Sequence, residues 1–197
     1  MAKPPDRSED FTETRVESRV AYEGGLLKVL RDEVRLPDGG QAWREYVLHP
    51  GAVMVLALVD DDTILLERQY RYPKRAHFYE LPAGKLEAGE PPLATAKREL
   101  VEECGFEADE WWPIARLDPC IGYSDEVIHL FGARGLRHVG NKLDVGEHLV
   151  TFEAKVADAM EWIRDGHITD TKTIIGIMWW ATWGRGGQRG ASSSPRR

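Results

Sequence analysis

The segment Gly84–Phe106 restricts the fold more than any other part of this chain, because it places a short acidic helix in the middle of the sequence. It reads GKLEAGEPPLATAKRELVEECGF. Proline is tolerated in a first helical turn, so Pro91 and Pro92 predict where the helix begins. Leu93–Cys104 consists mainly of helix formers, with apolar side chains at helical spacing. Gly105 follows where a left-handed residue commonly ends a helix.

Three glutamates, Glu99, Glu102 and Glu103, lie three and four residues apart on this predicted helix. Like charges at that spacing repel each other, and near the helix C-terminus they also oppose the helix dipole. Arg98 precedes Glu99 and is expected to point elsewhere, so it suits orienting or bridging a carboxylate better than neutralising the cluster. Bound Mg²⁺ is the stronger candidate, because it prefers hard oxygen ligands and bridges carboxylates to phosphates.

The alternative is that these glutamates form the solvated outer face of an amphipathic helix. For an isolated run of this kind that alternative is favoured, because short motifs match by chance. Here the glutamates occur together with three glycines, a further glutamate and an arginine in one strand, loop and helix context: Gly84, Gly89, Glu90, Arg98 and Gly105. This combination favours the metal site.

The rest of the chain predicts many strands, with two helices near its end. Val20–Leu48 reads as antiparallel hairpins around a turn at Pro37–Gly40, and Ala52–Val59 reads as a buried central strand with Thr63–Arg68 as its hairpin partner. Further strands are expected at residues 111–117, 126–133 and 148–154, and helices at Val156–Asp165 and Asp170–Trp183, the second capped by Asp170. This order predicts an α+β fold, with helices on the faces of a mixed sheet.

Composition narrows the class of protein. The chain has 26 basic and 33 acidic residues, a net charge of −7, which argues against a nucleic-acid backbone binder. No apolar run approaches the ~18 residues of a membrane span. Neither Cys104 nor Cys120 has metal-ligand spacing, so reduced thiols are expected. The polar N-terminal segment has no apolar stretch of the kind a secretory signal requires, so a cytoplasmic location is expected. Residues 1–15 and 184–197 are predicted to be disordered.

The acidic segment resembles the Nudix box, G-x5-E-x7-R-E-U-x-E-E-x-G-U, where U is a bulky aliphatic or similar residue. All fixed positions match: Gly84, Glu90, Arg98, Glu99, Leu100, Glu102, Glu103, Gly105 and Phe106. The resemblance implies an α/β/α sandwich that hydrolyses a nucleoside diphosphate linked to another group. By that resemblance Glu99, Glu102, Glu103 and the carbonyl of Ala83 bind the metal, and Arg98 orients a box carboxylate.

Residues 20–183 also resemble ADP-ribose pyrophosphatases. The resemblance implies an N-terminal arm over residues 16–50 that pairs with a second subunit, a hydrolase domain over residues 51–183, and a homodimer. Arg71 and Arg44 are then candidate phosphate or ribose contacts, with a surface salt bridge as the alternative for both. Glu80 is a further substrate candidate, and Tyr70 or Phe78 could stack on the base. The tryptophans of the last predicted helix are expected to pack into the core.

The general base is predicted to be Glu147, in a glycine-containing loop that could close over a diphosphate, with Glu126 as the alternative. The predicted reaction converts ADP-ribose to AMP and ribose 5-phosphate with Mg²⁺, for which Mn²⁺ could substitute. Ile121 stands where ADP-ribose relatives usually carry a proline, outside the box, so this departure concerns specificity and not the metal site. The alternatives are another nucleotide sugar or a dinucleotide as substrate, or a nucleotide sensor without catalysis.

Overall fold

The computed structural model describes residues 10–143, 146 and 148–184, which fall into two compact units. The first unit contains the chain up to His49 together with Cys120–Glu126, and the second contains Pro50–Pro119 and the chain from Val127 onward. The sequence predicts a boundary between arm and hydrolase domain near residue 50, but it does not predict that Cys120–Glu126 belongs with the N-terminal strands.

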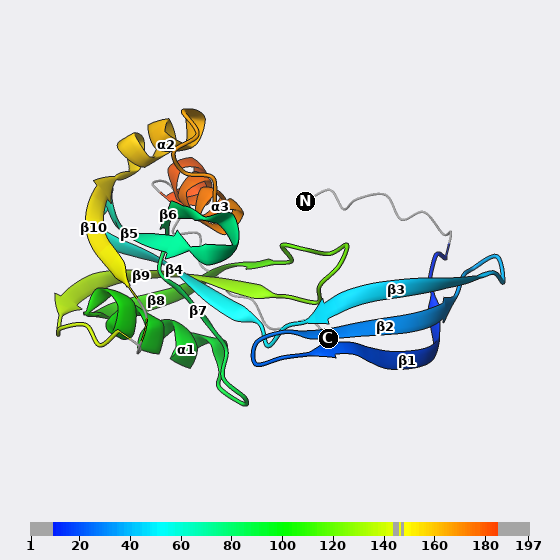
Figure 1. Cartoon of the computed structure of the whole chain (residues 1–197). Coiled ribbons are helices and arrows are strands. Elements are labelled where there is room, and N and C mark those ends of the chain that lie inside the picture. The colour runs from blue at the N-terminus through cyan, green and yellow to red at the C-terminus, as the bar shows by residue number, and fades with distance from the viewer. Residues whose placement is uncertain (1–9, 144–145, 147, 185–197) are drawn as a thin grey trace. The chain divides into compact units, whose positions relative to one another are not determined.

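The first unit is built on a three-stranded antiparallel sheet, in the order β1 (Thr14–Glu23), β2 (Lys28–Arg35) and β3 (Gln41–Leu48) (Figure 1). The expected turn joins β2 to β3 through the hydrogen bond from Gly39 N to Leu36 O, 3.0 Å long. Strand β1 begins at Thr14, inside the segment predicted to be disordered, because pairing with β2 extends to Thr14 opposite Arg35. All residues of β1 are exposed in the single chain.

Backbone hydrogen bonds attach the segment Cys120–Glu126 to the end of β3. Val47 N donates to Tyr123 O at 2.9 Å, and Asp125 N donates to Val47 O at 3.3 Å. The amide of His49 donates to the Asp125 carboxylate at 2.8 Å. This pairing joins residues far apart in the sequence, which explains why local patterns do not reveal it.

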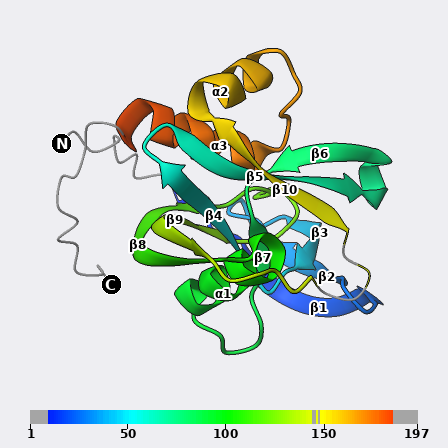
Figure 2. The ribbon, with the colours of Figure 1, turned by 90° about the vertical axis from the view of Figure 1, so that its left-hand side faces the viewer.

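The second unit holds a seven-stranded mixed sheet with the order β10-β5-β4-β9-β8, in which β6 adds to β5 and β7 adds to β4. Its strands are β4 (Ala52–Asp60), β5 (Thr63–Arg71), β6 (Ala76–Glu80), β7 (Ala83–Lys85), β8 (Phe106–Leu117), β9 (Ile128–His138) and β10 (Leu149–Lys155). Helix α1 (Pro92–Glu99) covers one face, and helices α2 (Val156–Arg164) and α3 (Thr171–Trp179) cover the other (Figure 2).

Strand β4 lies at the centre because nearly all of its side chains are apolar. Successive strand residues point to opposite faces. Met54, Leu56 and Leu58 pack on the side of α2 and α3, whereas Val53 and Val55 pack on the side of α1. Since both faces are covered, the strand is buried along most of its length, as its apolar run predicts.

The central helix begins and ends close to where the sequence predicts. Helix α1 starts with proline in its first turn and continues into a π-helical turn at Leu100–Cys104. Gly105 then adopts the left-handed conformation with φ of 76°, which confirms its predicted role as terminator. Val139 N donates to Gly105 O at 2.7 Å, so the end of this helix is held against the chain that follows β9.

In the C-terminal part of the chain, the predicted helix cap is confirmed, but the predicted burial of all the tryptophans of the last helix is wrong. The side chain of Asp170 accepts a hydrogen bond from Thr173 N and caps α3, as expected. Trp180 is buried in the core, but Trp183 is 59% exposed, and its ring lies edge to face with that of Trp179. The helix ends in a π-helical turn at Trp180–Gly184, so Trp183 leaves the buried face. None of the helices in the described part of the chain is long and apolar enough to cross a bilayer.

We expect Gly105→Ala to lower the free energy of unfolding by about 3 kcal/mol. The substitution would force alanine into a left-handed conformation and bring its Cβ within 2.7 Å of Asn141 N. Gly89→Ala is the matched control, because Gly89 has φ of 80° but nothing lies within 4 Å of the added Cβ. That variant should lose only about 1 kcal/mol in urea unfolding. Equal losses in the two variants would show that the contact with Asn141 is unimportant.

Candidate active site

Close packing against Gly84 holds the Glu99 side chain beside strand β7. A Cβ added to Gly84 would lie 1.8 Å from the Glu99 carboxyl carbon, so no other residue fits there without moving Glu99. Gly84 is itself fixed by pairing with Val53 of β4. The glycine that opens the acidic segment therefore sets the position of one of its carboxylates.

Glu103 connects the end of the helix to the same strand. Its side chain is almost completely buried, with the residue 4% exposed, and its Oε2 accepts a hydrogen bond from Ala83 N at 2.9 Å. The two predicted metal-ligating glutamates Glu99 and Glu103 thus meet the backbone of consecutive residues, Ala83 and Gly84. Burial of Glu103 requires such a partner, because an uncompensated buried carboxylate is strongly unfavourable.

Arg98 joins the carboxylates of this region. Its Nη1 lies 3.0 Å from Glu99 Oε1 and 2.7 Å from Glu102 Oε2, and its Nη2 lies 3.1 Å from Glu90 Oε2. The hydrogen bond to Glu90 contributes most to raising the pKa of Arg98, and Glu102 and Glu99 add to the rise. The expectation that Arg98 points away from Glu99 is wrong, since its guanidinium contacts both Glu99 and Glu102.

The donor set of this region fits a hard divalent cation. Glu99, Glu102 and Glu103 offer carboxylate oxygens, the ligands that Mg²⁺ and Mn²⁺ prefer, and the Gly84 backbone leaves the space that Glu99 needs. Within residues 10–143, 146 and 148–184, no three histidine, cysteine or carboxylate side chains already enclose a common metal position. The Arg98 guanidinium contributes a positive charge between Glu99 and Glu102.

Arg71 and Glu80 form a second charged pair on strands β5 and β6. Arg71 Nε and Nη2 donate to the two oxygens of Glu80 at 2.7 Å and 2.8 Å, a bidentate arrangement. Burial acts to raise the pKa of Glu80, but the Arg71 hydrogen bonds and the Lys172 charge outweigh it, so the pKa falls below its usual value. Glu80 therefore stays ionised although its side chain is only 5% exposed.

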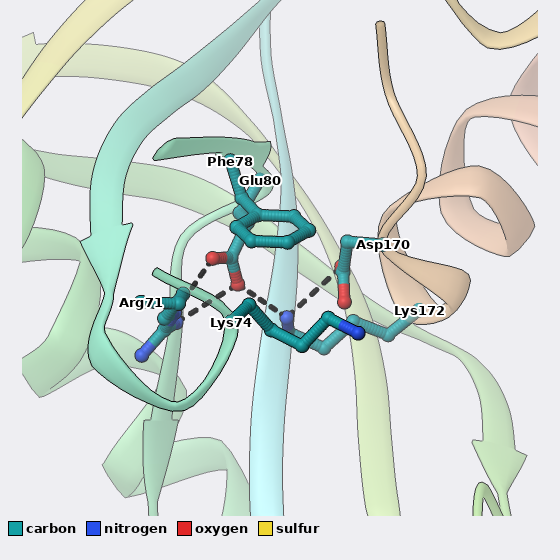
Figure 3. A pocket seen from close by; sticks show the side chains of 6 residues that line it. All are labelled: Arg71, Lys74, Phe78, Glu80, Asp170 and Lys172. Atoms are coloured by element: carbon teal, nitrogen blue, oxygen red, sulfur yellow. Dashed lines mark hydrogen bonds and ion pairs between the residues drawn. The ribbon is translucent and has the colours of Figure 1, made fainter. Parts of the chain in front are cut away.

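A pocket of about 190 Å³ opens beside this pair (Figure 3). It is lined by Arg71, Lys74, Phe78, Glu80, Asp170 and Lys172. The hydrogen bond with Glu80 contributes most to raising the pKa of Arg71, and the charge of Glu103 makes a smaller contribution. The Arg71 guanidinium thus lies within electrostatic range of the acidic helix.

The pocket contains residues that the sequence predicts and others that it does not. Arg71, Glu80 and Phe78 line the same pocket, whereas Tyr70 is exposed and contacts His77 edge to face. Lys172 was not predicted. The sequence offered one signal for Lys172: the predicted cap at Asp170 places Lys172 in the first turn of a helix.

The structure does not test the roles of three other predicted residues. Arg44 pairs with Glu13 in the first unit, through Nε at 2.9 Å and through Nη2, so the salt bridge considered as an alternative is present. Glu126, also in the first unit, has its carboxylate 3.8 Å from His49 Nδ1. Glu147 lies outside the described residues. The roles of all three stay predictions.

The thiol of Cys104, adjacent to Glu103, does not resemble a nucleophile. It donates a hydrogen bond to Glu67 Oε1 at 3.1 Å and is buried. Burial, followed by the negative charge of Glu67, raises the pKa of Cys104 far above its usual range. The group therefore stays a neutral thiol, whereas a nucleophilic cysteine needs its thiolate.

Comparison with known proteins identifies two matching family models. The model described as NUDIX domain matches residues 48–170, and the model described as nucleoside diphosphate sugar hydrolase N-terminal domain matches residues 13–47. Among solved structures, one described as an ADP compounds hydrolase superposes with a TM-score of 0.81 at 22% identity, covering 91% of this chain and 99% of that chain. This similarity confirms the expected Nudix fold.

Two curated relatives are similar over most of their length. A methanol dehydrogenase activator from Bacillus methanolicus is 37% identical over 171 residues, covering 86% of this chain and 92% of the relative. An ADP-ribose pyrophosphatase from Bacillus subtilis (strain 168) is 37% identical over 160 residues, covering 80% of this chain and 86% of the relative.

Replacing Glu80 by Gln should destabilise the fold in a pH-dependent way. Because folding lowers the pKa of Glu80 from its usual 4.5, its contribution to stability is complete above that value and disappears as the pH falls through the folded-state pKa. We expect Glu80→Gln to lose about 1–3 kcal/mol at pH 7, less than a fully buried pair would, because Arg71 is partly exposed.

Thermal unfolding of wild type and Glu80→Gln between pH 3 and pH 8 measures this loss. Glu110→Gln is the matched control, because Glu110 forms an exposed ion pair with Arg134. It should change stability by about 0.5 kcal/mol or less at any pH. A Glu80→Gln loss that stayed constant down to pH 3 would contradict the assigned ionisation.

Proposed function

The chain belongs to the NUDIX family, and on that premise we propose that this Nudix hydrolase cleaves the diphosphate of ADP-ribose in a magnesium-dependent reaction, giving AMP and ribose 5-phosphate. One observation carries the proposal: all the glutamates of the box are present, and two of them contact the backbone of β7. Glu103 accepts a hydrogen bond from Ala83 N, and Glu99 packs against Gly84. A sensor without catalysis would have no need of this costly group of like charges.

The ligands in this proposal are the carboxylates of Glu99, Glu102 and Glu103 together with the carbonyl of Ala83. A bound Mg²⁺, or Mn²⁺ in its place, would neutralise diphosphate charge and lower the pKa of the attacking water. Arg98 holds Glu99 and Glu102 with one nitrogen, so it orients these carboxylates for the cation. The hydrogen bond from Ala83 N fixes one oxygen of Glu103 at 2.9 Å.

Substrate and water are positioned by residues outside the box. The edge of Arg71 that does not contact Glu80 is suited to a phosphate or ribose oxygen, and Phe78 offers an apolar surface beside it. Glu147 is proposed as the base that takes a proton from the attacking water, with Glu126 as the alternative. Attack on phosphorus in line with the departing oxygen then separates the two phosphate products.

We also propose that the protein is a homodimer formed through its N-terminal sheet. The sheet leaves large apolar side chains exposed in the single chain: Val16, Val20, Tyr22 and Trp43. Strand β1 lies at the edge of the sheet, where unpaired backbone groups can add a further strand. The cytoplasmic location stays a prediction.

A substrate panel with Mg²⁺ tests the proposed substrate. ADP-ribose, GDP-mannose, a diadenosine polyphosphate and ATP should be compared by kcat/KM, with phosphorylated products separated by anion exchange. We expect ADP-ribose to give the highest value and to yield AMP and ribose 5-phosphate in equal amounts. A preference for ATP would contradict the proposed substrate, and binding of ADP-ribose without turnover would favour a sensor.

Glu103→Gln tests the proposed metal ligand. The amide oxygen can still accept the hydrogen bond from Ala83 N, so the fold should remain, but the lost negative charge should reduce kcat by about 100-fold or more. Glu107→Gln is the matched control, because Glu107 is exposed and pairs with Arg137. Full activity of Glu103→Gln would exclude Glu103 as a ligand.

A further inference from the structure

Lys172 lies where helix α3 meets strand β6, and it binds two carboxylates there. Its Nζ is 2.5 Å from Glu80 Oε2 and 2.9 Å from Asp170 Oδ2 (Figure 3). The Lys172 side chain is only 17% exposed, so these contacts are formed largely out of water. Lys172 therefore acts on the same carboxylate that holds Arg71.

Two further hydrogen bonds fix the position from which Lys172 reaches Glu80. Asp170 caps the helix by accepting from Thr173 N at 3.0 Å, and Leu81 N donates to Thr173 Oγ1 at 2.9 Å. Thr173 is fully buried. The first turn of α3 is thus attached to the residue that follows Glu80, which leaves Lys172 little freedom to move away.

Charge balance gives Lys172 a role beyond packing. Arg71, Lys74 and Lys172 bring three positive charges to the pocket, and Glu80 and Asp170 bring two negative ones, which leaves a net charge of +1. Within the described residues Lys74 has no ion-pair partner, and Arg71 Nη1 has no hydrogen bond. Without Lys172 the pocket would be neutral, and Glu80 would depend on Arg71 alone.

We propose that Lys172 is a positioning residue for substrate binding: it holds and neutralises Glu80, so that the outer edge of Arg71 is kept in place for a diphosphate oxygen. The ligand class is a nucleoside diphosphate derivative, so the inference rests on the proposed function. An anion in this partly buried pocket gains more from one unit of positive charge than it would in open water.

Binding of α,β-methylene ADP-ribose, whose phosphorus atoms are joined by carbon, tests the inference without turnover. Calorimetry on the full chain should show Lys172→Met binding about tenfold more weakly than wild type, as expected for loss of a hydrogen bond between charged groups. Lys172→Arg keeps the charge and should recover most of the affinity. Equal affinity of wild type and Lys172→Met, or no binding by wild type, would overturn the inference.

Kinetics separate positioning from structural support. With ADP-ribose, Lys172→Met should raise KM about tenfold, change kcat by about twofold or less, and weaken the dependence of kcat/KM on ionic strength. Ile177→Val is the control, because it shortens a buried core side chain of the same helix without changing the pocket lining or its charge. It should lower Tm and leave KM unchanged. A KM increase as large as that of Lys172→Met would overturn the inference.

The two proposals can fail separately. If wild type binds the analogue in a Lys172-dependent way but does not hydrolyse ADP-ribose, the proposed function fails and the inference on Lys172 stands. If wild type hydrolyses ADP-ribose but Lys172→Met binds the analogue normally, the inference fails and the proposed function stands.

Discussion

Electrostatic repulsion among Glu99, Glu102 and Glu103 is the constraint around which the second unit is organised. These carboxylates lie near the C-terminal end of a helix, where the helix dipole also disfavours negative charge. The chain offsets the repulsion with the Arg98 guanidinium and the amide of Ala83, and it accommodates Glu99 in the space left by Gly84. The contacts with Ala83 and Gly84 also depend on the pairing of β7 with β4, which places these two residues beside the helix.

A second group of charges, a few residues earlier in the chain, also compensates a buried carboxylate with neighbouring positive charges. Glu80 ends strand β6 and is buried, and it is compensated from β5 by Arg71 and from α3 by Lys172. Only Leu81 and Pro82 separate Glu80 from the β7 backbone that receives Glu99 and Glu103. Helix α3 therefore stabilises Glu80, at the end of the strand that precedes β7. It contributes no carboxylate to the proposed metal site.

Features set by neighbouring residues could be predicted from the sequence. The buried strand at Ala52–Val59, the terminator Gly105 and the Asp170 cap depend on local hydrophobicity or on one backbone conformation. Features set by distant residues could not. The pairing of Cys120–Glu126 with β3 and the contact of Lys172 with Glu80 depend on the tertiary arrangement, and the direction of Arg98 depends on Glu90 across the loop.

The central claim is that the acidic helix is built to bind a divalent cation, and a titration of the full chain with Mn²⁺, followed by the electron paramagnetic resonance signal of the free ion, tests it most directly. The account predicts saturable binding that Mg²⁺ displaces and that tightens when a nucleoside diphosphate is added. An unbound Mn²⁺ signal at every protein concentration, with nucleotide present, would contradict it.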